Sequence, residues 1–274
     1  MNPMRNFIRF ALLAVLAALI SSCGRKAPDT DLIVYYSQTG NTEILAKLFA
    51  EKLNADIFRL ECETPYPDSF EETIEESRKE IEEGLGRTLV NAQASLDAYR
   101  TIYIGYPVWF GTIPPPLTAF IAENDLQGRN IVLFCTYGSG GVKSSTKSFK
   151  TAVPDCNLLG SYGIAARRLD AAGAEVDEFL ANLGKTDEQD APSCSEPRPY
   201  ADTDQAIFIE ATEGYGYLHL TPVMVAVEEK ADGSSVWFFT CESSMREGMP
   251  AVNVEACIVK PAEGKAYLKS MERL

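Results

Sequence analysis

The sequence predicts an α/β fold in which a doubly wound, five-stranded parallel sheet is followed by a small β-rich segment. From residue 31 to residue 184, short apolar runs alternate with longer stretches of helical spacing, which is the pattern of repeated strand–helix units. The central apolar runs are continuous, as in strands that helices cover on both faces. Beyond residue 204, closely spaced strand-like runs with turns between them replace the helical pattern.

The N-terminus has the features of a bacterial lipoprotein signal. Arg5 and Arg9 precede an apolar run at residues 10–20, which ends in Ile20-Ser21-Ser22-Cys23. This run would extend only about 16 Å as a helix, too short to cross a bilayer, whereas a basic start and a short apolar centre are typical of secretory signals. The last four residues resemble a lipobox. We therefore expect a signal peptide at residues 1–23, lipidation of Cys23 and a tether at residues 24–30; an ordinary signal that contains a cysteine is the alternative.

The domain at residues 31–184 has five expected strands that alternate with five expected helices. The expected strands are residues 32–36, 56–60, 101–106, 131–136 and 158–163. The expected helices are residues 41–53, 68–84, 114–122, 144–151 and 171–183.

The remainder of the chain changes character. Residues 185–203 are polar and contain prolines, which predicts a linker. Residues 204–274 are expected to be β-rich. Their strand-like runs are residues 206–211, 218–228, 235–241, 252–259 and 266–269.

Composition narrows the classes of function. A net charge of −14 argues against nucleic-acid binding, which depends on Lys and Arg. It suits a carrier that meets basic partners, or a protein that needs the charge only for solubility. The cysteines other than Cys23 form no C-x-x-C pair and have no metal-ligand spacing with His219, the only histidine. No catalytic triad or carboxylate pair stands out either. We therefore expect no metal site and no catalytic side chain.

The first of three candidate binding loops, residues 37–42, lies between a strand and a helix. It combines hydroxyl groups with a glycine, and the amides of the following helix favour an anion. It lacks the lysine of triphosphate loops and the glycine spacing of dinucleotide sites. A single terminal phosphate therefore fits it best, and a plain helix cap is the alternative.

Two more loops complete the candidate site. The second loop, residues 107–111, contains Trp109 and Phe110, which can stack on a planar ring. The third loop, residues 136–141, is glycine-rich and lets the backbone approach such a ring. In an open sheet of strand order 2-1-3-4-5, these loops meet the first loop at the carboxyl ends of the strands, where ligands bind.

These loops carry a family resemblance. Residues 106–116 read Y-P-V-W-F-G-T-I-P-P-P, and together with the other two loops they resemble the flavodoxin family, in particular a branch of bacterial flavodoxin-like lipoproteins. The resemblance implies the sheet order 2-1-3-4-5 and one bound FMN, with its phosphate on the first loop and its ring between the other two. The residues that it assigns to FMN are Ser37, Gln38, Thr39, Gly40, Asn41, Thr42, Pro107, Val108, Trp109, Phe110, Gly111, Thr136, Tyr137, Gly138, Ser139, Gly140 and Gly141.

The C-terminal segment is similar to the split barrels of the pyridoxamine-phosphate-oxidase type. Residues 216–222 and 237–243 carry this resemblance. The segment is shorter than such barrels, so we expect a partial barrel and assign no ligand residues to it. His219 is expected to be a strand residue rather than a catalyst.

Three functions remain open on the sequence. An electron-transfer flavoprotein, with a protein or quinone as its redox partner, needs no acid or base because the cofactor supplies the chemistry. An FMN-dependent quinone or nitro reductase would need a second nucleotide site, for which no basic cluster is evident. The third is a binding module without turnover. The lipid anchor would hold the globular part outside the cytoplasm on the bacterial envelope and be its sole attachment to the membrane.

Overall fold

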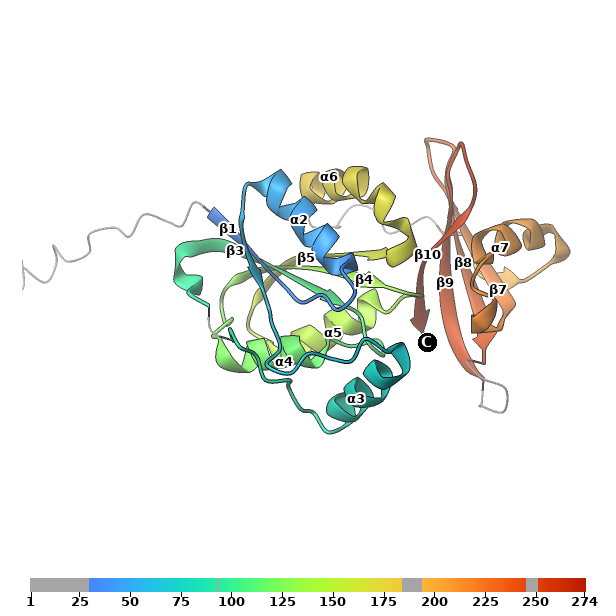
Figure 1. The fold of residues 1–274 in the computed structure, drawn as a ribbon. Coiled ribbons are helices and arrows are strands. Elements are labelled where there is room, and N and C mark those ends of the chain that lie inside the picture. Colours follow the sequence, from blue (N-terminus) through green and yellow to red (C-terminus); the bar gives the residue numbers. More distant parts are fainter. Residues whose placement is uncertain (1–29, 93, 184–193, 245–250) are drawn as a thin grey trace, which may run out of the picture.

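The computed structural model describes residues 30–92, 94–183, 194–244 and 251–274 (Figure 1). The expected signal peptide with Cys23, nearly all of the expected tether and the first half of the expected linker lie outside the described residues. Within those described, no helix is both long and apolar enough to cross a membrane.

The first domain is built on a five-stranded parallel sheet, as the sequence predicts. Its strand order is β2-β1-β3-β4-β5, which confirms the expected 2-1-3-4-5 topology. The strands are β1 (Thr30–Tyr35), β2 (Asp56–Arg59), β3 (Tyr99–Pro107), β4 (Asn130–Tyr137) and β5 (Asn157–Ala165).

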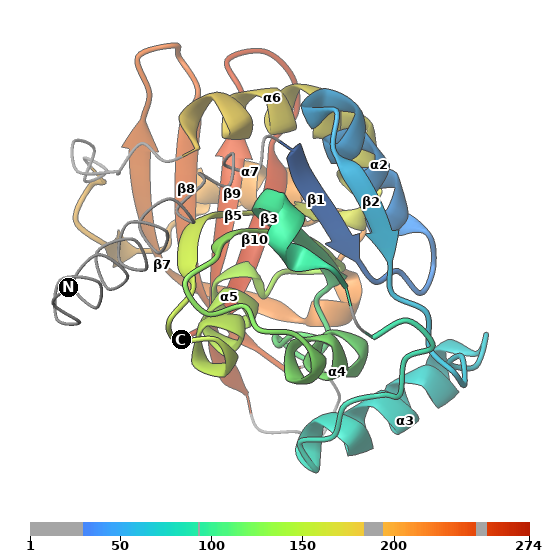
Figure 2. The same ribbon diagram turned by 90° about the vertical axis from the view of Figure 1, so that its left-hand side faces the viewer.

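Helices cover both faces of this sheet (Figures 1 and 2). On one face, α2 (Asn41–Leu53) and α6 (Ala172–Asn182) pack on alternate strand residues. On the other face, α4 (Pro115–Glu123) and α5 (Val142–Ala152) pack on the intervening residues. These two apolar layers explain the continuous apolar runs, since both faces of each central strand are buried. Helix α3 (Phe70–Glu82) follows β2 and makes contact with α4.

The second domain is an antiparallel sheet of strand order β10-β9-β8-β7-β6, so the C-terminal segment is β-rich as expected. In chain order its strands are β6 (Arg198–Pro199), β7 (Leu220–Glu229), β8 (Ser235–Ser243), β9 (Val252–Lys260) and β10 (Tyr267–Arg273). Strand β6 falls within the expected linker and pairs with β7. The strand order is open, with β10 and β6 at its two edges.

Two details of this domain differ from the sequence-based expectation. The run at 206–211 lies in helix α7 (Gln205–Thr212) rather than in a strand. Phe208 and Ala211 are buried in the second core while Ile209 is 56% exposed, which is a helical period. His219 precedes β7 with a φ of 41°, and is therefore not a strand residue.

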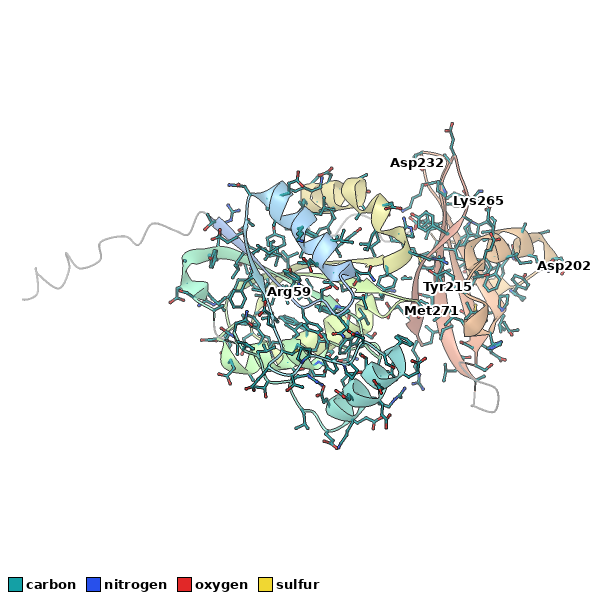
Figure 3. All side chains as sticks on the ribbon, viewed as in Figure 1. Arg59, Asp202, Tyr215, Asp232, Lys265 and Met271 are labelled. Atoms are coloured by element: carbon teal, nitrogen blue, oxygen red, sulfur yellow. The ribbon has the colours of Figure 1, made fainter. Side chains whose placement is uncertain are left out.

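The two domains meet along β10 (Figures 1 and 3). This edge strand contacts α5 and β5 of the first domain. Arg168, in the 3₁₀ helix after β5, stacks its guanidinium 3.6 Å from the ring centroid of Tyr267. Arg167 stacks in the same way on Tyr215, at 3.4 Å. The C-terminal sheet therefore lies beside the carboxyl ends of β4 and β5.

Candidate functional site

The three loops singled out from the sequence come together at the carboxyl edge of the parallel sheet. The Oγ1 atoms of Thr42 and Thr136 lie 2.8 Å apart and share a hydrogen bond, which joins the first loop to the third. The amide of Val108 donates to the carbonyl of Thr136 at 2.8 Å, which joins the second loop to the third. The topology therefore brings these residues together as predicted.

The first loop holds an unpartnered hydroxyl next to a free helix terminus. Ser37 is 4% exposed, and among the described residues its Oγ has no hydrogen-bond partner. Gly40, the N-cap of α2, has a φ of 89°, a left-handed conformation that glycine adopts at little steric cost. No side chain caps α2, so its first amides are open to an anion. These donors fit a phosphate group.

Other side chains of the first loop contact their neighbours. Gln38 accepts a hydrogen bond from the Tyr36 hydroxyl at 2.6 Å and donates to the Pro67 carbonyl at 3.3 Å. Asn41 donates to Thr39 Oγ1 at 3.2 Å. The side chains of Gln38 and Asn41 thus shape the loop.

The second loop is a tight turn. Trp109 and Thr112 exchange two backbone hydrogen bonds, at 3.2 and 2.9 Å. Between them Phe110 and Gly111 have φ values of 51° and 74°, the signs that a type I′ turn requires at both central positions. Positive φ is uncommon for phenylalanine, and the turn leaves Phe110 46% exposed. The guanidinium of Arg78 on α3 lies 4.6 Å from the ring centroid.

An aromatic cluster orients Trp109. The rings of Tyr36 and Tyr66 meet the indole edge to face, with centroid distances of 5.9 and 5.0 Å. Tyr66 is in turn stacked under the guanidinium of Arg87 at 3.7 Å and donates a hydrogen bond to Glu80. Trp109 is half-buried, and these contacts restrict its ring to one orientation.

Burial favours the neutral form of two phenols of this cluster and of a neighbouring thiol. It raises the pKa of the phenols of Tyr36 and Tyr66 and that of the Cys62 thiol. Desolvation disfavours the charged form of each of these groups. They can therefore donate hydrogen bonds at physiological pH, but none of them is poised to exchange a proton.

The third loop packs on protein along half of its length. A Cβ on Gly141 would lie 2.8 Å from Val108 Cγ1, and one on Gly140 would lie 1.9 Å from the carbonyl oxygen of Met271 on β10. At Gly138 nothing lies within 4 Å of the corresponding position. Gly138 therefore leaves space beside the loop, whereas Gly140 and Gly141 admit neighbouring segments; the assignment of these glycines to FMN stays a prediction.

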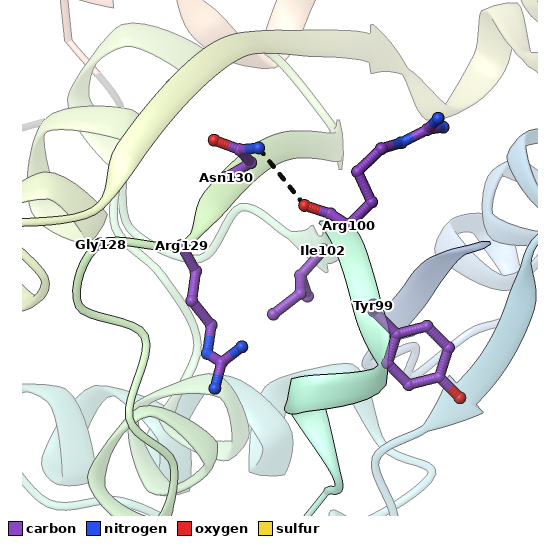
Figure 4. A pocket seen from close by; sticks show the side chains of 6 residues that line it. All are labelled: Tyr99, Arg100, Ile102, Gly128, Arg129 and Asn130. Carbon is purple, nitrogen blue, oxygen red and sulfur yellow. Dashed lines mark hydrogen bonds between the residues drawn. The ribbon is translucent and has the colours of Figure 1, made fainter. Parts of the chain in front are cut away.

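Two cavities lie elsewhere in the described part of the chain. One of about 180 Å³ lies at the amino ends of β3 and β4, opposite the three loops (Figure 4). Its charges are paired, because Arg100 binds Asp31 at 2.7 Å and Arg129 binds Asp97 at 2.5 Å. A second cavity of about 350 Å³ lies behind the second loop, between α3, α4 and α5.

Comparison with known proteins places the first domain in a family. The sequence profile described as Flavodoxin matches residues 30–170, just over half of the 274-residue chain. The chain belongs to the flavodoxin family. The match ends before the C-terminal sheet, so the resemblance of that sheet to a split barrel stays a prediction. No curated protein matches the sequence.

Solved structures share the flavodoxin fold. A protein from Bacteroides uniformis that is assigned to the flavoproteins is 25% identical, with a TM-score of 0.50, and the alignment covers 54% of this chain and 97% of that one. A second, from Bacteroides eggerthii, is 24% identical over 55% of this chain and 98% of its own, with a TM-score of 0.48. A flavoprotein from Lactobacillus acidophilus, solved in complex with FMN, is 19% identical over 55% and 98%, with a TM-score of 0.46.

Several residues at this edge of the flavodoxin domain were not foreseen. Tyr66 lies in the loop after β2. Because this loop also leaves the carboxyl edge of the sheet, its position in the topology is the one signal that could have indicated a role for Tyr66 at the site. Met271 and Glu272 belong to β10. Met271 contacts the third loop and Glu272 the first turn of α5, each from about 130 positions away in the sequence. No local pattern marks such a contact.

Proposed function

We propose that this flavodoxin-family protein binds one FMN at the carboxyl edge of its parallel sheet and transfers electrons. Residues 37–42 hold the phosphate, and the flavin ring lies between residues 107–111 and residues 136–141. The observation that carries the proposal is the buried Ser37 hydroxyl, which has no partner within the described part of the chain and lies beside the uncapped N-terminus of α2. A buried hydroxyl without a partner is unfavourable by about 1–3 kcal/mol, and a phosphate oxygen would satisfy it.

The protein's own part in the reaction is to bind and to orient. Ser37 Oγ has less than 1 Å² of accessible surface, so the first loop shifts to admit the phosphate. Trp109 presents an indole whose orientation Tyr36 and Tyr66 maintain. FMN, when bound, supplies the electron-transfer chemistry. Because burial raises the pKa of both phenols, neither of them takes up or releases a proton at physiological pH.

The test is reconstitution of the purified soluble part with FMN. We expect a flavin absorption band that stays with the protein through gel filtration, and reduction by dithionite without steady turnover of NADPH and a quinone. Sustained turnover would identify a reductase instead. Failure to retain FMN at micromolar concentrations would refute the proposal and favour a binding module.

The chain is proposed to be exported and lipid-anchored to the bacterial cell envelope through Cys23. The support is the short apolar run and lipobox-like sequence that precede this cysteine. A Cys23→Ala variant should remain unprocessed or become soluble in cell fractionation. If the variant is cleaved and retained on the membrane as the parent is, the anchor is elsewhere.

The proposed redox partner is a basic protein or a quinone. The net charge of −14 supports a basic protein, because opposite charges accelerate encounter. The rate of electron transfer to such a partner should fall steeply as the salt concentration rises. A rate that is independent of salt would favour a neutral acceptor such as a quinone.

A further inference from the structure

Helix α5 begins directly after the third loop and has no cap of its own. Its N-cap residue is Gly141, which has no side chain that could cap the helix. The first amides of the helix therefore need other acceptors. The amide of Gly141 donates to the Met271 carbonyl at 3.1 Å, and that of Lys143 donates to Glu272 Oε1 at 3.1 Å. Both acceptors lie on β10, in the other domain.

Glu272 is a buried carboxylate that β10 carries to this helix terminus. It is 8% exposed, and a carboxylate removed from water needs donors. Besides the Lys143 amide, it accepts a hydrogen bond from Ser144 Oγ at 3.5 Å. Its negative charge also lies at the positive end of the helix dipole. The α5 terminus and Glu272 therefore satisfy each other across the domain boundary.

The third loop is shaped to fit against this strand. The backbone of Met271 occupies the space that a side chain at position 140 would need, and Figure 3 shows Met271 where the C-terminal sheet meets the first domain. At the start of the loop, the Tyr137 hydroxyl donates to the Lys269 carbonyl, also on β10. The loop is thus held at both ends, while the position of Gly138 between them stays open.

We propose that the C-terminal sheet completes the flavin site by holding the third loop in its binding conformation, with Glu272 as the positioning residue. A loop ordered in advance loses less entropy when a ligand binds, which increases affinity. The inference rests on the proposed function, since it concerns how the FMN site is formed. It assigns to the second domain a role that the family match, which ends at residue 170, does not include.

Two variants of the full chain test this proposal, one for each kind of contact. Glu272→Gln removes the charge but keeps the shape of the side chain. Gly140→Ala places a methyl group 1.9 Å from the Met271 carbonyl and forces strand and loop apart. In Glu272→Gln we expect roughly tenfold weaker FMN binding, the effect of losing a charge-assisted hydrogen bond. In Gly140→Ala we expect weaker FMN binding because the loop is displaced from β10. In the apoprotein we expect faster amide hydrogen exchange at residues 137–144.

The matched control is Glu255→Gln. Glu255 is the register partner of Glu272 on β9 and lies 3.5 Å from the Lys143 ammonium. Such a partly exposed ion pair contributes little, so FMN affinity and exchange should stay as in the parent. Circular dichroism verifies that each variant is folded.

The outcomes separate the inference from the proposed function. Unchanged exchange in the apoprotein of both folded variants would overturn the docking of β10 on the loop. Faster exchange with parental FMN affinity would overturn the coupling, that is, the proposed effect of this docking on FMN affinity. A parent that binds no FMN would refute the proposed function and the coupling with it, while the exchange data would still report the docking.

Discussion

At the scale of single residues, two hydroxyls of the first loop have opposite roles in the apoprotein. Thr42 is 1% exposed and shares a hydrogen bond with Thr136, so it joins two loops whether or not a ligand is present. Ser37 is also buried, at 4% exposed, but its hydroxyl has no partner among the described residues. Only Ser37 thus gains its first hydrogen bond when an anion arrives.

This difference predicts contrasting effects on stability and on binding. Ser37→Ala should weaken FMN binding about ten- to a hundredfold, the effect of one hydrogen bond to a charged group. Thermal unfolding of the apoprotein should meanwhile show no loss of stability, because the removed hydroxyl was unsatisfied. Thr42→Ala should destabilise the apoprotein by about 1–3 kcal/mol, since it leaves Thr136 without this partner. Riboflavin, which has no phosphate, is the control and should not distinguish Ser37→Ala from the parent.

Substitution of Trp109 should affect the binding of the flavin ring rather than that of the phosphate. Trp109→Ala should weaken the binding of FMN and riboflavin alike and raise the potential of the fully reduced step, because the stacking surface is lost. Trp109→Phe should retain most of the affinity. The measurements are fluorescence titration with each flavin and spectroelectrochemistry. Parental riboflavin affinity in the alanine variant would place the ring elsewhere.

At the scale of elements, a buried ion pair fastens β6 to the start of α7. Asp204, 1% exposed, accepts two hydrogen bonds from the Arg198 guanidinium, each at 2.7 Å, and one from the Ala201 amide at 2.9 Å. The Arg198 contact is the main reason that the pKa of Asp204 lies below its ordinary value. This bidentate pair therefore anchors β6, the short strand by which the linker joins the second sheet.

The pair predicts a pH-dependent contribution to stability. Because folding lowers the pKa of Asp204, its contribution is fully present above the unfolded value of about 4 and is lost as the pH falls through the folded value. Asp204→Asn should destabilise the protein by about 1–3 kcal/mol at pH 7, a figure reduced because Arg198 is partly exposed. Chemical denaturation at pH 7 and pH 3 should show this difference shrinking. A difference that is independent of pH would assign the effect to shape rather than to charge.

At the scale of the whole molecule, the flavodoxin domain and the C-terminal sheet form a shared boundary. Arg168 stacks on Tyr267 of β10 and binds Glu175 of α6 at 2.5 Å, with only 15% of its side chain exposed. It thus links the two domains at the boundary that also contains Glu272. We therefore expect the unfolding of one domain to depend on the other.

Weakening this boundary should reduce that dependence. Arg168→Ala removes a buried cation–π contact worth about 1–2 kcal/mol. We expect its calorimetric transition to broaden or to split in two. Arg59→Ala is the control. It breaks the more exposed ion pair with Glu43 at β2, the opposite edge of the parallel sheet, and should leave the shape of the calorimetric transition unchanged. An unchanged transition in Arg168→Ala would show that this contact does not couple the domains.

The sequence alone determined the first domain and the three loops at its edge. Continuous apolar strands, amphipathic helices and glycine- and hydroxyl-containing turns are local patterns, and right-handed crossovers then bring the turns to one edge. Residues 206–211 were misassigned because a short apolar run suits a strand or a helix equally. Phe208 and Ala211 lie three residues apart on the face of the helix that packs into the second core. Only the position of the neighbouring sheet decides that this face is buried.

Only the tertiary structure decided what surrounds that edge. Tyr66 orients Trp109 from another loop. From β10, Met271 reaches the third loop and Glu272 reaches the first turn of α5. Contacts between such distant positions depend on how complete domains dock, which local propensity and periodicity do not encode. Gly140 illustrates the difference: in the sequence it indicated close approach to a ligand, and in the fold it admits the backbone of β10.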